Sequence, residues 1–203
     1  MTLVKICGVC DVAGAVAAVE AGADMIGLHF CTSPRRLGPA EARRIVSALQ
    51  RRPVIVGVFI DADPEEIGAV AAEVGLDMAQ LHGSEDPATV WPLPVMKVLK
   101  VRDGVVPPAE SWPDPLLLDT WSDDQRGGTG RGWDWDLARP LVADRRVFVA
   151  GGLDPENVGR LVHALAPHGV DVSSGVESAP RHKDPALMRA FVSAVRQAES
   201  VRT

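Results

Sequence analysis

The stretch VIVGVFIDADPEEIGAVAAEVGLDMAQLH, residues 54–82, contains one complete unit of strand, helix and strand. Two short runs in it, residues 54–60 and 78–82, are mostly apolar, which is typical of parallel strands that helices cover. Between them, Asp63 followed by Pro64 predicts a helix start, because an acidic N-cap accepts hydrogen bonds from the first turn and proline fits its first position. Gly75 predicts the end of that helix. The stretch therefore indicates an α/β fold with parallel strands.

The same alternation continues along the whole chain. We expect eight strands, at residues 4–7, 25–30, 54–60, 78–82, 95–101, 116–119, 147–150 and 170–173. Helix starts are predicted at Asp11, Gly38-Pro39, Asp63-Pro64, Asp86-Pro87, Asp154-Pro155 and Asp184-Pro185. Between residues 101 and 112, Pro107 and Pro108 leave little room for a helix, so this connection should be short or irregular.

Two observations favour a closed barrel over a doubly wound open sheet. A Gly-x-Asp pattern leads into three strands, as expected of a barrel built from repeated strand–helix pairs, and it occurs at Gly22/Asp24, Gly75/Asp77 and Gly169/Asp171. A doubly wound sheet usually carries G-x-G-x-x-G after its first strand, whereas this chain has CGVC at residues 7–10. We predict one domain over residues 1–203, a single (βα)8 TIM barrel.

Composition narrows the classes of function. The chain has 203 residues, 46% hydrophobic and 24% charged, which suits one globular domain. A formal net charge of −6 argues against a nucleic-acid partner, which needs a basic face. No apolar run approaches the ~20 residues of a membrane-spanning helix, so we expect no membrane partner. The chain enters its first strand directly and has three cysteines, so we expect no signal peptide, no disulfide framework and a cytoplasmic location.

In a parallel barrel, functional residues gather where strands end and the following loops begin. Two such loops predict a phosphate site: Gly151-Gly152 after the seventh strand, and Ser173, Ser174 and Gly175 after the eighth. Glycines allow backbone N–H groups to approach a phosphate closely, and loops seven and eight are the usual phosphate site of this fold. The alternative, that Gly-Gly only makes a tight turn, is weaker because both loops carry the signal.

Two strand ends carry groups for acid–base chemistry. Cys7 ends the first strand, and Lys5 lies on the same face two residues earlier, where an ammonium favours the thiolate form. Asp119 ends the sixth strand after three leucines, a costly position unless the carboxyl is paired or partly protonated. Each has a structural alternative: Cys7 as a small buried hydrophobe, and Asp119 as a loop or cap residue.

Seven motifs, in order along residues 3 to 195, together resemble the phosphoribosylanthranilate isomerase family. They are residues 4–8 (VKICG), 33–35 (SPR), 56–59 (VGVF), 80–83 (QLHG), 117–120 (LLDT) with 127–130 (GGTG), 150–153 (AGGL) and 171–177 (DVSSGVE). The resemblance implies a (βα)8 barrel of the ribulose-phosphate-binding type that works without a cofactor or metal. It also implies an Amadori rearrangement of N-(5-phosphoribosyl)anthranilate in tryptophan biosynthesis, with a small phosphorylated substrate as partner. Independently of the resemblance, we expect a monomer rather than a dimer.

Carried over by position, the resemblance makes Asp119 the general acid that protonates the furanose oxygen and Cys7 the general base at the adjacent sugar carbon. Arg35 would hold the anthranilate carboxylate, although the neighbouring Arg36 could take that place. The remaining substrate contacts that it implies are Gln80, His82, Gly128, Gly151, Gly152, Asp171, Ser173, Ser174 and Gly175.

Three alternatives remain open at this point. Cys7 and Cys10 could form a redox pair, although such pairs usually cap a helix in a small domain. Cys7, Cys10, His29 and Cys31 could bind zinc if the first two strands bring them together. A dual-function barrel that serves both histidine and tryptophan biosynthesis would resemble this fold, but such enzymes use an aspartate as base at the end of the first strand, where this chain has Cys7.

Overall fold

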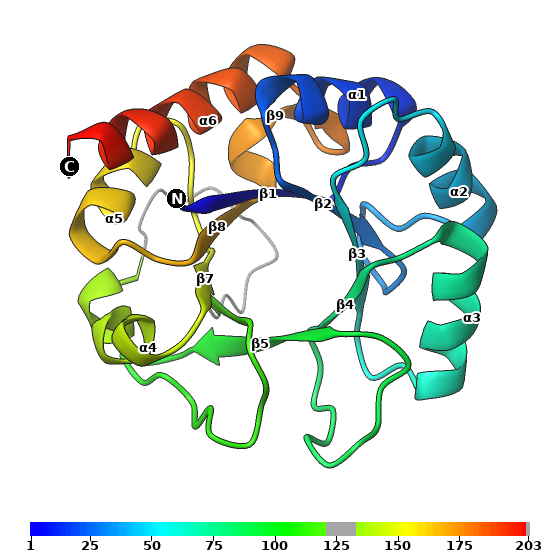
Figure 1. The fold of residues 1–203 in the computed structure, drawn as a ribbon, viewed down its shortest axis with the longest axis horizontal. Coiled ribbons are helices and arrows are strands. Elements are labelled where there is room, and N and C mark those ends of the chain that lie inside the picture. Colours follow the sequence, from blue (N-terminus) through cyan, green and yellow to red (C-terminus); the bar gives the residue numbers. More distant parts are fainter. Residues whose placement is uncertain (121–132, 202–203) are drawn as a thin grey trace.

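The computed structural model describes residues 1–120 and 133–201. In this part of the chain, strands β1 to β8 are parallel and close into a barrel in sequence order (Figure 1). Their bounds are β1 (Leu3–Cys7), β2 (Met25–His29), β3 (Val54–Phe59), β4 (Met78–Leu81), β5 (Val95–Val101), β6 (Leu116–Thr120), β7 (Val147–Val149) and β8 (Gly169–Val172). The predicted barrel is confirmed, and no predicted strand end is wrong by more than one residue.

Helices lie around the outside of the barrel (Figure 1). They are α1 (Val12–Ala21), α2 (Pro39–Ser47), α3 (Pro64–Val74), α4 (Arg139–Asp144), α5 (Val158–Leu165) and α6 (Pro185–Ser200). Two short 3-10 helices, η1 (Trp135–Ala138) and η2 (Ser174–Val176), and a hairpin of β9 (Glu177–Ala179) and β10 (His182–Lys183) complete the described elements. Among the described residues, no helix combines the length and apolar character needed to cross a membrane.

Aspartate side chains cap three of these helices as predicted. Asp11 accepts from the Gly14 N–H, Asp63 from the Glu66 N–H, and Asp184 from the N–H groups of Ala186 and Leu187. A good N-cap contributes about 1 kcal/mol to its helix.

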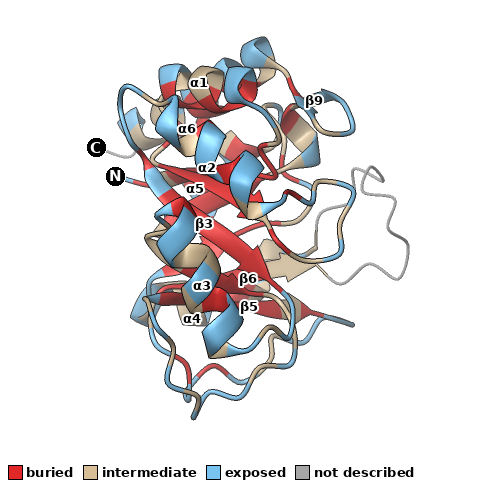
Figure 2. Cartoon of the chain, turned by 90° about the vertical axis from the view of Figure 1, so that its right-hand side faces the viewer, coloured by how far each residue is buried: buried red, intermediate tan, exposed pale blue. Residues whose placement is uncertain are grey.

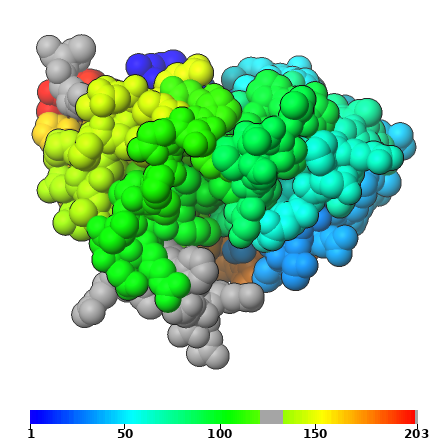
Figure 3. Space-filling model, turned by 90° about the horizontal axis from the view of Figure 1, so that it is seen from below, coloured from blue at the N-terminus to red at the C-terminus, as the bar shows by residue number. Residues whose placement is uncertain are grey.

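The predicted helix start at Asp86-Pro87 is wrong. Asp86 does accept from the Ala88 N–H at 2.8 Å, but the chain makes only a turn there before β5. Pro92 and Pro94 follow within two turns, and a proline inside a helix removes a hydrogen bond and clashes with the preceding turn. The connection after β5 is irregular, as Pro107 and Pro108 predicted. Figure 3 shows this side of the molecule, where the green and cyan segments lie.

Similarly, α5 begins later than Asp154 predicts. The Asp154 carboxylate accepts from the N–H groups of Glu156 and Asn157, and Asn157 accepts in turn from the Asp154 N–H at 3.1 Å. These bonds close a separate turn, so the helix starts only at Val158.

The Gly-x-Asp pattern has a structural role at two of its three positions. Asp24 accepts from the Val4 N–H at 2.8 Å and Asp77 accepts from the Ile55 N–H at 2.7 Å, so each ties the start of one strand to the strand before it. The third match is wrong, because Gly169 begins β8 and Asp171 lies inside the strand.

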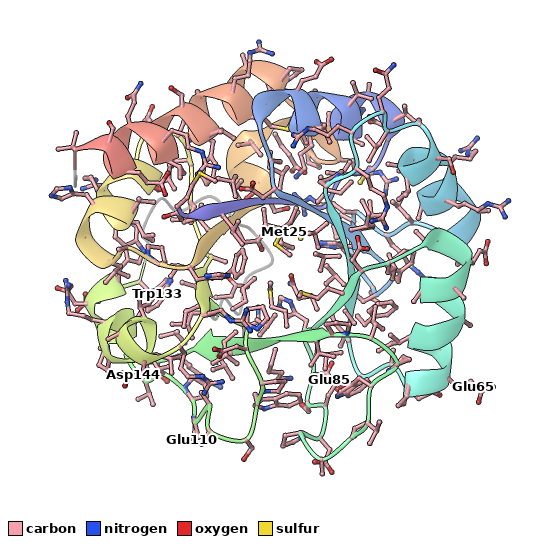
Figure 4. The ribbon with its side chains drawn as sticks, in the orientation of Figure 1. Met25, Glu65, Glu85, Glu110, Trp133 and Asp144 are labelled. Carbon is pink, nitrogen blue, oxygen red and sulfur yellow. The ribbon has the colours of Figure 1, made fainter. Side chains whose placement is uncertain are left out.

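Most of the barrel strands are buried (Figure 2), and the core that they form with the helices has two parts. The larger lies between the strands and the surrounding helices, and the smaller fills the barrel with Met25, Val56, Met96, Val98, Leu117, Phe148 and Ala150. Figure 4 shows Met25 at the centre of the barrel and Glu65 on the outer side of α3. Because apolar side chains fill the lower interior, polar groups that face inward gather towards one end of the barrel.

Candidate active site

A cavity of about 290 Å³ lies at the carboxyl ends of the strands. The predicted site residues that line it are Cys7, Arg35, Gln80, His82, Asp119, Gly151, Gly152, Asp171, Ser173 and Ser174. His29, Lys100 and Thr120 also line it, although no role in the reaction was predicted for them. Gly175 does not belong to this lining, and Gly128 lies outside the described residues.

Cys7 lies at the cavity floor, only 5% exposed, with the Lys5 ammonium beside its thiol. Lys5 is fully buried and donates to Asp171 at 2.9 Å. Burial alone would lower the pKa of Lys5, but the nearby Asp171 carboxylate and Cys7 thiol outweigh it, so the pKa is raised and the side chain stays charged. The predicted cation beside Cys7 is therefore confirmed.

One buried cation thus serves two acidic groups. Burial raises the pKa of Asp171 to about 7, with the Lys5 charge opposing that rise and the Cys7 charge adding to it. Asp171 and Cys7 therefore both interact with the single Lys5 ammonium.

Lys5→Met should destabilise the fold by about 3–5 kcal/mol, because it leaves Asp171 buried without a partner. In a chain of this length that loss corresponds to a fall of ~6–20 °C in the midpoint of thermal unfolding, measured by circular dichroism. Arg139→Met is the matched control: its ion pair with Asp136 is exposed, and surface pairs contribute at most about 1 kcal/mol. The double variant Lys5→Met/Asp171→Leu should recover most of the stability, and an equal loss there would contradict the explanation.

Because Gly27 on β2 has no side chain, there is room beside it for the Cys7 thiol and the Lys5 ammonium. A Cβ at Gly27 would lie 2.7 Å from the Cys7 sulfur and 3.1 Å from the Lys5 nitrogen. A thiol can escape such a contact only by rotating away from its present position. Glycine is therefore needed here for space.

Gly27→Ala should lower kcat at least tenfold while costing only about 1–3 kcal/mol of stability, since the added methyl group displaces the thiol from the cavity floor. Steady-state kinetics with a parallel melting curve separates the two effects. The control is Gly68→Ala on α3, where the new Cβ meets only ordinary contacts at 3.6 Å with Pro92. Unchanged kcat in Gly27→Ala would show that the thiol position does not matter.

Asp119 reaches the same cavity from β6, across the barrel from β1. Lys100 donates to its carboxylate at 2.8 Å, and the His82 Nε2 atom lies 3.8 Å away. The Asp119 carboxyl that follows three leucines therefore has a hydrogen-bond partner in Lys100. Burial and the Lys100 charge lower the pKa of His82 to about 4 despite the Asp119 charge, so this imidazole is neutral near pH 7.

Arg35 has a planar guanidinium already held in place. Its Nε donates to Glu177 Oε1 at 2.7 Å and its Nη2 to Oε2 at 2.5 Å, while Lys183 donates to the same carboxylate at 2.9 Å. The hydrogen bonds to Glu177 raise the pKa of Arg35. Arg36 points elsewhere and lines a separate hollow with Pro39 and residues of α3. Of the two arginines, only Arg35 faces the cavity.

The glycine loops form one wall of the cavity. Gly151 and Gly152 have φ of +89° and +66°, a left-handed conformation that favours glycine. A Cβ at Gly175 would lie 1.9 Å from the Leu153 carbonyl oxygen, so the loop after β8 rests directly on the loop after β7. The two loops predicted as a phosphate site therefore do meet, and Gly175 has a packing function in that contact.

The buried amide of Gln80 also faces this cavity. Gln80 is 2% exposed, and its Oε1 atom has no hydrogen-bond partner among the described residues. A buried acceptor without a partner is costly, so a donor on a ligand is its natural complement.

Cys7 and Cys10 have different hydrogen-bond partners. Cys7 faces His29, whereas the Cys10 thiol donates to the backbone carbonyls of Gly8 and Arg35, and all three cysteines are free. Within residues 1–120 and 133–201, no three His, Cys, Asp or Glu side chains come together in an arrangement that could hold a metal ion.

Known proteins provide independent evidence. The family model described as N-(5'phosphoribosyl)anthranilate (PRA) isomerase matches residues 4–194. A curated relative, N-(5'-phosphoribosyl)anthranilate isomerase of Rubrobacter xylanophilus, is 46% identical over 97% of this chain and 100% of its own.

Solved structures agree with this assignment. Monomers generated from the dimeric isomerase of Thermotoga maritima have a TM-score of 0.83 at 33% identity, covering 97% of this chain and 100% of theirs. A phosphoribosyl anthranilate isomerase in complex with reduced 1-(o-carboxyphenylamino)-1-deoxyribulose 5-phosphate has a TM-score of 0.82 at 33% identity, with the same coverage. The chain belongs to the N-(5'-phosphoribosyl)anthranilate isomerase family.

Proposed function

We propose that this chain converts N-(5-phosphoribosyl)anthranilate to 1-(2-carboxyphenylamino)-1-deoxyribulose 5-phosphate, with Asp119 as the acid and Cys7 as the base. One observation carries the assignment of roles. A thiol next to a buried ammonium and a carboxyl paired with a lysine face one cavity from separate strands, and the two glycine loops form another wall. Proton abstraction next to a carbonyl equivalent needs an acid and a base held on separate elements around one substrate.

The proposed reaction consists of two proton transfers, one from Asp119 and one to Cys7, followed by tautomerisation. Asp119 donates a proton to the ring oxygen, the bond from that oxygen to the anomeric carbon breaks, and the amine nitrogen forms an iminium ion. Lys100 stabilises the carboxylate that Asp119 becomes. The Cys7 thiolate then takes a proton from the neighbouring carbon, and the C–H electron pair forms the enolamine double bond. Tautomerisation of the enolamine gives the ketone.

The two ends of the substrate carry the charges that position it. Arg35 would bind the anthranilate carboxylate through the N–H groups of its guanidinium that do not bond to Glu177. Because Glu177 already fixes the position of the guanidinium, less conformational entropy is lost when the substrate binds. The loops that contain Gly152 and Ser174 would hold the phosphate. Gln80 would accept a sugar hydroxyl, which satisfies its Oε1 atom.

The test is an assay with phosphoribosylanthranilate, in which the fluorescence of the substrate disappears as the sugar ring opens. The product should have the mass of the substrate and a ketone carbon in its NMR spectrum. The same protein should not isomerise the phosphoribosyl amine substrate of histidine biosynthesis. An inactive protein, or one active only on that second substrate, would overturn the proposal.

We further propose that one chain, folded as one domain over residues 1–203, is sufficient for activity, because the acid, the base and both glycine loops of this chain surround one cavity. Light scattering coupled to size exclusion should give the mass of one chain. A mass of two chains with activity lost on dilution would contradict a working monomer.

We propose the cytoplasm as the location. Three free thiols, one of them the base, suit a reducing compartment better than an oxidising one. Cell fractionation would test this.

A further inference from the structure

His29 lies at the end of β2, beside the Cys7 thiol, and has no part in the mechanism described so far. Its Nε2 atom is 3.3 Å from the Cys7 sulfur and its Nδ1 atom is 3.0 Å from the Ser33 hydroxyl oxygen. The imidazole therefore joins the thiol on one side to a hydroxyl on the other.

The bonds of Ser33 favour one tautomer of His29. The Ser33 hydroxyl oxygen already accepts from the Arg35 N–H at 3.1 Å, and its own proton is available for donation to the His29 Nδ1 atom, 3.0 Å away. When Nδ1 accepts, the ring proton of a neutral histidine sits on Nε2 and points at the sulfur.

Burial and the charges around Cys7 and His29 keep His29 neutral. The titratable and charged groups that act on Cys7 and His29 are Lys5, Cys31, Arg35, His82, Asp171 and Lys183. Burial first, and then the Lys5 and Arg35 charges, lower the pKa of His29 to about 4. A histidine in these surroundings cannot easily take the thiol proton, but it can donate a hydrogen bond to a thiolate.

We propose that His29 is a positioning residue that holds the Cys7 thiolate through an Nε2–H hydrogen bond, with Ser33 fixing the tautomer. The inference rests on the proposed role of Cys7 as base. The thiolate lies between Lys5 and His29, with its remaining lone pair facing the substrate. When it takes the carbon-bound proton, the new S–H bond forms at the sulfur, and His29 neither gains nor loses a proton.

The first test measures Cys7 without any turnover. In a Cys10→Ser/Cys31→Ser background, the rate of Cys7 alkylation by iodoacetamide is followed against pH by mass spectrometry. His29→Val should move the midpoint of this curve upward by about one pH unit or more, since a hydrogen bond to a charged group is worth that much. Alkylation near pH 7 should then slow roughly tenfold.

Two further variants separate a hydrogen bond from simple packing. His29→Gln can place an N–H donor near the position of Nε2 and should restore most of the midpoint. Ser33→Ala should give a smaller shift in the same direction as His29→Val. In the parent, nitrogen NMR should show the His29 proton on Nε2, a result that depends on no variant of His29 or Ser33. A proton on Nδ1, an unchanged midpoint in His29→Val, or faster alkylation in it would each overturn the proposal.

The second test is the pH profile of kcat. His29→Val should shift its acid limb upward by the same amount and regain activity at high pH, whereas a merely structural role would lower kcat equally at all pH values. The two tests also distinguish failure of the inference about His29 from failure of the proposed isomerase function. If the alkylation midpoint shifts but phosphoribosylanthranilate is not isomerised, only the proposed function fails. If isomerisation is normal in the parent and nothing shifts in His29→Val, only this inference fails.

Discussion

Cys7→Ser should lower kcat by about 10²–10⁴-fold, the range that a general base contributes. A serine hydroxyl fills nearly the same space but does not ionise near neutral pH, so the Lys5 ammonium has no thiolate to stabilise. KM should change little, because the groups proposed to hold the carboxylate and the phosphate are untouched. Steady-state fluorescence kinetics provides both constants.

Cys10→Ser is the control for this experiment. Cys10 is the next cysteine along the chain. It does not belong to the cavity lining, and its thiol donates to the backbone carbonyls of Gly8 and Arg35. A serine hydroxyl can keep these bonds, so kcat should stay within about twofold. Full activity in Cys7→Ser would remove the base from the mechanism.

Asp119→Asn should also lower kcat by about 10²–10⁴-fold, because an amide cannot deliver a proton to the ring oxygen. The amide oxygen can still accept from Lys100, whose side chain is 29% exposed, so the fold should keep its stability. Single-turnover measurements should place the loss in ring opening, with no iminium-derived product appearing in a burst.

The control for Asp119 is Asp61→Asn, at the end of another strand. Asp61 accepts from the Ser84 N–H through an oxygen that asparagine retains, and it lies outside the cavity lining. Activity should not change there. An equal loss in both variants would indicate a general effect on the loops and would contradict an acid role for Asp119.

The strands were predictable from the sequence because each is a short apolar run between turn signals. Helix starts were less so. The Asp-Pro signature describes only the first turn, and whether a helix continues depends on the residues of the next two turns, as Pro92 and Pro94 demonstrate after Asp86. Local signals therefore locate the strands, including their ends, better than they locate the helices.

Many cavity residues were predictable because the carboxyl ends of parallel barrel strands meet at one end of the barrel, so residues at those ends line a common site. Lys100 was a detectable omission, because it is a charged residue near the end of β5. The partnership of Arg35 with Glu177 was not detectable, since 142 positions separate them and neither has a periodic signature. The orientation of His29 towards Cys7 likewise depends on strand register, which the sequence does not specify in advance.

The contact between Gly175 and the Leu153 carbonyl oxygen has a practical consequence for transplanting the proposed phosphate loops into another scaffold. A residue with a Cβ in place of Gly175 would clash with the Leu153 carbonyl oxygen, so each loop fits only beside the other. A grafted barrel should therefore receive the segments after β7 and β8 as an inseparable pair. Libraries of variants that change one of these segments while the other is held constant will mostly contain pairs of loops that clash.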